Sequence, residues 1–122
     1  METNVDLGKL GETVACQELE RRGYAILATR HRTRFGEIDI IAEEGGVIVF
    51  IEVKARRTAR FGSAAEAIPH WKRKRIGAMA LDYLAWTNRV NRACRFDVVA
   101  IDGITTPDRT VCVIEDAFTF DR

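Results

Sequence analysis

Hydrophobic positions along the chain follow two different periods, which separate predicted helices from predicted strands. Residues 10–22 and 69–86 place apolar side chains three and four positions apart, as an amphipathic helix does. Gly23 favours the end of the first helix, and Pro69 suits the first turn of the second. Short apolar or alternating stretches predict strands at residues 24–29, 37–42, 47–53, 96–101 and 111–114.

The resulting order, α-β-β-β-α-β-β, predicts an α/β fold with a mixed sheet flanked by helices, not a run of βαβ units. The 122 residues suit a single domain with one core, spanning residues 1–122. The composition, 47% hydrophobic and 30% charged, is ordinary for a globular protein. Residues 58–68 include Gly62 and are expected to form a loop.

Composition also bears on location and covalent chemistry. No apolar run approaches the roughly 20 residues needed to span a bilayer, so no membrane partner is expected. The first ten residues do not resemble a secretory signal. Cys16, Cys94 and Cys112 are too widely spaced for a zinc site or a disulfide framework. We therefore expect a cytoplasmic protein.

The glycines at positions 45 and 46 predict a tight two-residue turn between two strands. Such a turn sets Glu44 opposite Val47, so that Asp39 faces Glu52 and Glu37 faces Lys54. Side chains alternate along a strand, which puts these four residues on one face. The other face, with Ile38, Ile40 and Ala42 against Val49, Ile51 and Val53, is apolar and is expected to be core.

Two carboxylates that face each other on a sheet are unfavourable. At about 5 Å they repel by roughly 3 kcal/mol at an effective dielectric constant near 20. A divalent cation compensates directly, because carboxylate oxygens are ligands that Mg²⁺ prefers. Two other interpretations remain open: Glu37 and Lys54 form an ordinary ion pair, or Asp39 and Glu52 are simply solvated. A single bulge would also change the register.

The predicted helices add two charged candidates. Glu12 shares a helix face with Ala15, Cys16 and Leu19, so it either aims a third carboxylate at the sheet or follows the helix dipole. Lys72 precedes an apolar stripe on the second helix and either reaches the carboxylates or extends to solvent. That stripe comprises Ile76, Met79, Ala80, Tyr83 and Leu84.

Charge is unevenly distributed although the net charge is only +1. Between residues 54 and 75, Glu66 is the only acid among many bases. This asymmetry indicates a polyanionic partner or, equally, a solvated basic face. The candidate contacts to a phosphate backbone are Arg30, Arg32, Arg34, Arg56, Arg57 and Lys72.

Several runs carry a family resemblance. They are residues 8–12 (GKLGE), 35–42 (FGEIDIIA), 50–56 (FIEVKAR), 61–62 (FG), 66–68 (EAI) with Lys72, 95–99 (RFDVV) and 117–118 (AF). The second and third resemble the core of the PD-(D/E)xK nucleases. Together the runs cover nearly the whole chain, which resembles the YraN-type endonuclease family, a bacterial family similar to archaeal Holliday-junction resolvases.

The resemblance implies a restriction-endonuclease-like three-layer fold. It also implies that Asp39 and Glu52 bind Mg²⁺ or Mn²⁺, that Lys54 orients a water molecule and that Glu12 is an accessory acid, which makes these four the candidate catalytic residues. Arg30 stands where such families often have Asn. Two roles remain open for Asp97: it is a buried ion-pair partner, or it hydrogen-bonds to the residues that bind the metal.

The expected function is that of a metal-dependent endonuclease hydrolysing DNA phosphodiester bonds, on branched or structured DNA by family analogy. A homodimer would suit a substrate with two-fold symmetry. Two alternatives remain: a non-catalytic nucleic-acid-binding module that retains the nuclease fold, and an interaction protein whose basic face meets a protein partner.

Overall fold

The computed structural model describes residues 6–58 and 68–119 and arranges them as two helices and five strands. The predicted element order and the α/β class are confirmed, with strands longer than expected. Most of the predicted loop, residues 59–67, lies outside the described residues. The elements are α1 (Leu7–Arg21), β1 (Ala25–Thr33), β2 (Gly36–Glu44), β3 (Val47–Ala55), α2 (His70–Trp86), β4 (Cys94–Asp102) and β5 (Thr110–Phe118).

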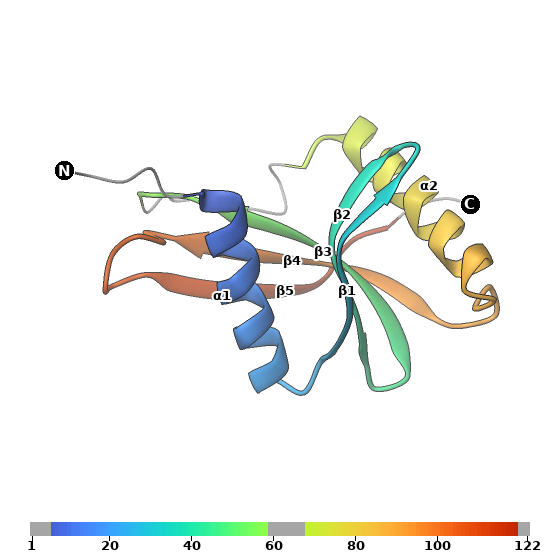
Figure 1. Ribbon diagram of the computed structural model, residues 1–122, viewed down its shortest axis with the longest axis horizontal. Coiled ribbons are helices and arrows are strands. Elements are labelled where there is room, and N and C mark those ends of the chain that lie inside the picture. Colours follow the sequence, from blue (N-terminus) through green and yellow to red (C-terminus); the bar gives the residue numbers. More distant parts are fainter. Residues whose placement is uncertain (1–5, 59–67, 120–122) are drawn as a thin grey trace.

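The strands form one mixed sheet in the order β1-β2-β3-β4-β5. Strands β3 and β4 are parallel and are connected through α2, whereas the other neighbours are antiparallel. Helices α1 and α2 cover opposite faces of the sheet, which gives three layers (Figure 1). Apolar side chains are therefore buried on both sides of the central strands, as a parallel pair inside a sheet requires.

Helix α1 begins earlier than predicted because Asp6 caps it. The Asp6 side chain accepts a hydrogen bond from the backbone N–H of Lys9 at 3.1 Å, which satisfies one of the free donors of the first turn. Gly11 lies against the end of β3, where an added Cβ would come within 3.0 Å of the Cβ of Ala55. This close approach positions the next residue, Glu12, beside the sheet.

The buried faces of the helices follow the sequence pattern closely in α2 and less closely in α1. All five residues of the stripe predicted for α2 are buried. In α1, Glu12 and Cys16 lie half-buried at the edge of the core-facing side instead of within it. The buried positions of α1 are Gly11, Val14, Ala15 and Leu19.

The predicted turn between β2 and β3 is confirmed. Gly45 and Gly46 have φ values of 57° and 82°, which glycine adopts without the steric cost that other residues meet. The ladder then runs in the predicted register, with Ile41 opposite Phe50.

One assignment to a hairpin face is wrong. The sequence places Ile38 on the same face as Ile40, but Ile38 packs in the core under α2 and Ile40 in the core under α1. The alternation of side chains therefore breaks at Asp39, between them. Arg30, which lies between the β1 residues paired with Ile38 and Ile40, has a positive φ of 50°. A local irregularity of both strands thus turns the backbone at the candidate site.

Candidate functional site

The carboxylates of interest lie where β2 and β3 stop pairing. The ladder continues from the turn as far as Ile40 opposite Ile51. Asp39 and Glu52 come next in the same register, beyond the last paired residues. The backbone N–H of Val53 donates to Asp39 Oδ2 at 2.8 Å, so a side chain takes the place of the ladder there. The predicted facing of Glu37 and Lys54 is likewise not a ladder pair.

Asp39 is held in a strongly perturbed environment. Burial, followed by the nearby charge of Glu52, raises the pKa of Asp39 from 3.8 to about 7. The hydrogen bond from Val53 and the charge of Lys72 oppose this rise without cancelling it. The Glu52 carboxyl therefore favours a proton on Asp39, because two neighbouring carboxylates cannot both be ionised without an electrostatic cost.

Two lysines accompany this pair. Lys72 Nζ donates to Glu52 Oε1 at 2.5 Å, and the Glu52 side chain is only 11% exposed. Burial alone would lower the pKa of Lys72, but the hydrogen bond and charge of Glu52 raise it overall. Burial, then the charge of Lys72, lowers the pKa of Lys54. Of the two interpretations of Lys72, the structure shows contact with a carboxylate, that of Glu52.

A cavity of about 290 Å³ opens beside Asp39, between the start of α1, the start of β2 and the end of β3. Its polar wall combines side chains from four elements. The lining residues are Leu7, Gly8, Glu12, Arg30, Glu37, Asp39, Val53, Lys54 and Ala55.

Glu12 reaches this cavity from α1 but has a partner of its own. Arg30 Nε lies 2.6 Å from Glu12 Oε2. In residues 6–58 and 68–119, no three or more His, Cys, Asp or Glu side chains are grouped so as to hold a metal ion. The structure therefore brings Glu12 and Asp39 to one cavity, and Asp39 and Glu52 to one pair, without joining all three.

The other predicted phosphate contacts divide into separate groups. Arg32 lies 3.4 Å from Glu37, and the guanidinium of Arg34 lies 4.8 Å from the ring centre of Phe35, both at the β1–β2 turn. Arg56 and Arg57 follow the end of β3, where the backbone of Arg56 bonds to Ile101 of β4 and to Ile104 just after that strand.

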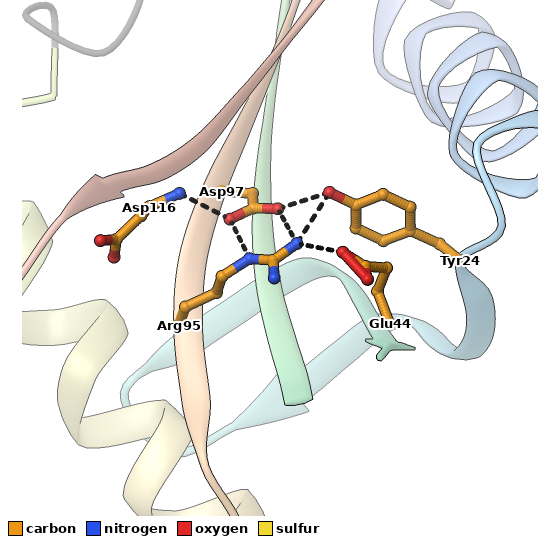
Figure 2. A network of polar contacts seen from close by, with 5 residues as sticks. All are labelled: Tyr24, Glu44, Arg95, Asp97 and Asp116. Carbon is orange, nitrogen blue, oxygen red and sulfur yellow. Dashed lines mark hydrogen bonds and ion pairs between the residues drawn. The ribbon is translucent and has the colours of Figure 1, made fainter. Parts of the chain in front are cut away.

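A buried polar network lies on the α1 side of β4 (Figure 2). Asp97 is completely buried; its Oδ2 accepts from the Tyr24 hydroxyl at 2.8 Å and its Oδ1 from Arg95 Nε at 3.0 Å. The backbone N–H of Asp116 donates to the same Oδ1 at 2.9 Å, and Arg95 also reaches Glu44. Asp97 is thus a buried ion-pair partner that ties β4 to β5 and to the segment between α1 and β1. A charged pair two residues apart within an apolar strand is the sequence signal of this network.

The fold and the site define a three-layer α/β protein with a carboxylate and lysine cluster where two central strands separate. Residues 11–101 match the uncharacterised protein family UPF0102, and the chain belongs to this family. The resemblance to the YraN-type family is thereby confirmed.

Relatives of the same family align over nearly their whole length. UPF0102 proteins of Alkaliphilus metalliredigens and Syntrophus aciditrophicus are 40% and 43% identical to the chain, over 92% and 97% of it and over 96% and 92% of their own lengths. The UPF0102 protein STH1475 of Symbiobacterium thermophilum is 44% identical over 92% of the chain and 95% of its own length. In the described part of the chain, neither helix is long and apolar enough to cross a membrane.

Proposed function

We propose that the protein is a metal-dependent endonuclease with a restriction-endonuclease-like fold that hydrolyses phosphodiester bonds of DNA. The observation that carries this proposal is the Asp39–Glu52 pair, buried together at the separated end of β2 and β3 with two lysines beside it. A perturbed pKa next to a cavity is typical of functional sites.

The donor set fits Mg²⁺ or Mn²⁺. Mg²⁺ is commonly bound through one or two carboxylates and keeps several waters, so Asp39 and Glu52 suffice as protein ligands and the adjoining cavity has room for water. When bound, such an ion lowers the pKa of a water molecule and polarises the scissile phosphate. Glu12 would contribute through water or through Arg30. Because a ligand must be deprotonated, metal affinity should fall below about pH 7 as Asp39 takes up a proton.

The lysines supply the remaining chemistry. Lys54 follows Glu52 by two positions on β3, and its lowered pKa makes its proton easier to release. It would position the attacking water and stabilise charge that develops on the phosphate. Lys72 holds the Glu52 carboxylate in place through its ion pair and presents a second ammonium group toward the same phosphate. Arg30, Arg32, Arg34, Arg56 and Arg57 are proposed contacts to the DNA backbone.

The test is cleavage by purified protein of linear, flapped, four-way and single-stranded DNA, with Mg²⁺ and with Mn²⁺. We expect cleavage of at least one branched or single-stranded form. Lys54→Ala should reduce cleavage by about two orders of magnitude while binding persists. Arg21→Ala, at an exposed basic residue at the opposite end of α1 from the cavity, is the control and should cleave normally. If the wild type cleaves none of these substrates with either metal, the proposal fails.

A non-catalytic nucleic-acid-binding module is the second candidate, and one observation favours it. Lys72 already neutralises Glu52, and the described residues form no cluster of three metal-binding side chains. Calorimetric titration with Mn²⁺ separates the two candidates. The nuclease should bind Mn²⁺ with release of a proton near neutral pH, and Asp39→Asn should abolish this binding. DNA binding that survives Asp39→Ala and Glu52→Ala, without any metal binding by the wild type, would favour the module. Sedimentation with and without four-way DNA tests the homodimer.

A further inference from the structure

Two aromatic side chains are exposed among basic ones on the α2 side of the molecule. Trp71, in the first turn of α2, is 59% exposed, and Phe35, in the β1–β2 turn, is 39% exposed. A guanidinium lies beside each ring: Arg75 is 5.0 Å from the ring centre of Trp71, and Arg34 is 4.8 Å from that of Phe35. Each ring therefore has a cation on one side and a large area open to solvent.

The two ring–cation pairs belong to one surface. The β1–β2 turn lies beside the first turns of α2 (Figure 1), and a Cβ at Gly36 would meet the side chain of Arg75 at 3.6 Å. We call this region the basic aromatic surface. It comprises Arg32, Arg34, Phe35, Trp71, Lys74 and Arg75.

The chemistry of this surface is selective. The surface carries four basic side chains, and Arg32, which lies 3.4 Å from Glu37, is itself 88% exposed. Among the residues that define it, the surface holds aromatic rings but no aliphatic side chain. Flat rings flanked by guanidinium groups suit a polyanion that carries planar bases, because bases stack on aromatic faces while phosphates pair with arginine. A lipid surface would instead favour rings mixed with aliphatic chains.

The surface also adjoins the candidate site. Trp71 directly precedes Lys72, which is bonded to Glu52. Arg32 contacts Glu37, which lines the cavity beside Asp39. A nucleic-acid strand bound on this surface would thus lead to the Asp39–Glu52 pair. A duplex keeps its bases stacked inside, so the rings would have nothing to stack on.

We infer that the basic aromatic surface binds an unpaired segment of nucleic acid. Nucleobases stack on Trp71 and Phe35, and phosphates pair with the neighbouring arginine and lysine side chains. The inference rests on the proposed function for its link to cleavage, and it makes DNA with a single-stranded portion the substrate class. Binding itself requires no metal ion and is measured apart from cleavage.

The experiment is fluorescence anisotropy of a labelled thymidine dodecamer, with a blunt duplex dodecamer for comparison, in the presence of a chelator. The full chain should bind the single strand more tightly than the duplex. Trp71→Ala should weaken single-strand binding about tenfold and Phe35→Ala severalfold, with duplex binding nearly unchanged. Trp86→Ala is the matched control, because Trp86 is 75% exposed at the other end of α2 and stacks on His31; it should change binding less than twofold.

A second readout separates contact from indirect effects. In a Trp86→Phe background the remaining tryptophan is Trp71, and its fluorescence should be quenched by the thymidine dodecamer. Unchanged fluorescence, or equal binding by wild type and Trp71→Ala, would overturn the inference. So would Trp71-dependent binding to vesicles of phosphatidylcholine and phosphatidylglycerol in equal amounts, with no Trp71 effect on the dodecamer.

Failure of the inference differs from failure of the proposed function. If the dodecamer binds through Trp71 but no DNA is cleaved with Mg²⁺ or Mn²⁺, single-strand binding by the basic aromatic surface is supported and the proposed nuclease function is refuted. If DNA is cleaved equally well by wild type and Trp71→Ala, the proposed nuclease function is supported and single-strand binding by the basic aromatic surface is refuted.

Discussion

Replacing Asp39 by asparagine should make the protein more stable at neutral pH while it abolishes the proposed metal binding. The pKa of Asp39 is raised to about 7 in the folded protein by burial and by Glu52. Ionising this carboxyl at neutral pH therefore costs free energy that the unfolded chain does not spend. The amide has the same shape, carries no charge and keeps an oxygen to accept the hydrogen bond from Val53.

The size and the pH window follow from the shift. Below about pH 4 the carboxyl holds its proton in both states, and the variant gains nothing. Between pH 3.8 and about 7 the unfolded state loses the proton first, so the free energy of unfolding of the wild type falls with rising pH. The full shift corresponds to about 4 kcal/mol. We expect a gain near 2 kcal/mol above neutral pH, because the amide also loses the attraction of Lys72.

The assay is urea unfolding of wild type and Asp39→Asn across this window, in a chelator. The stability difference should rise steadily with pH and level off just above neutrality. Asp82→Asn removes an exposed carboxylate on α2 and is the control; it should change the free energy of unfolding only slightly. If Asp39→Asn is less stable than the wild type at about pH 8 with an unchanged m-value, the electrostatic account of this site is wrong.

The other predictions concern catalysis and packing. Lys54→Ala should remove cleavage in a nicking assay while gel-shift affinity for DNA persists; equal loss of both would contradict its catalytic role. Asp97→Asn should lower the free energy of unfolding by about 3 kcal/mol, because Arg95 loses a buried partner, and Tyr24→Phe by about 1 kcal/mol, in denaturant titrations. Gly11→Ala should lower the melting temperature although alanine favours helix, because its Cβ meets β3 at 3.0 Å; a higher value would refute this.

The fold was largely predictable because its local signals agree. The two glycines of the β2–β3 turn have the positive φ values that a tight turn needs, and the register of the paired part of the hairpin follows from them. The five-residue stripe of α2 is buried as its spacing predicts. Helix α1 starts earlier than predicted because its first residue is set by the N-cap Asp6. This capping residue precedes the apolar stripe, so the hydrophobic spacing alone does not indicate it.

The site was less predictable because its geometry departs from regular structure. Register alone does not indicate that the ladder ends at Ile40 and Ile51, since that end depends on the irregular backbone around Asp39 and Arg30. The ion-pair partner of Glu52, Lys72, is 20 residues away in the chain on α2. Helical spacing alone left open whether Lys72 reaches the carboxylates or extends to solvent. The Asp97 network joins positions up to 73 residues apart, which no local pattern encodes.

The charges at the separated strands argue for selection on function instead of stability. Along the same hairpin, Ile41 and Phe50 pair as apolar neighbours and bury fully. Beyond the end of the ladder, Asp39 and Glu52 need a proton and the ammonium of Lys72 to offset their repulsion. Apolar residues there would extend the core at no electrostatic cost. Sites that lower stability without a structural gain are typically those that act on a ligand. A variant at Asp39 that is both more stable and unable to bind Mn²⁺ would demonstrate this trade-off directly.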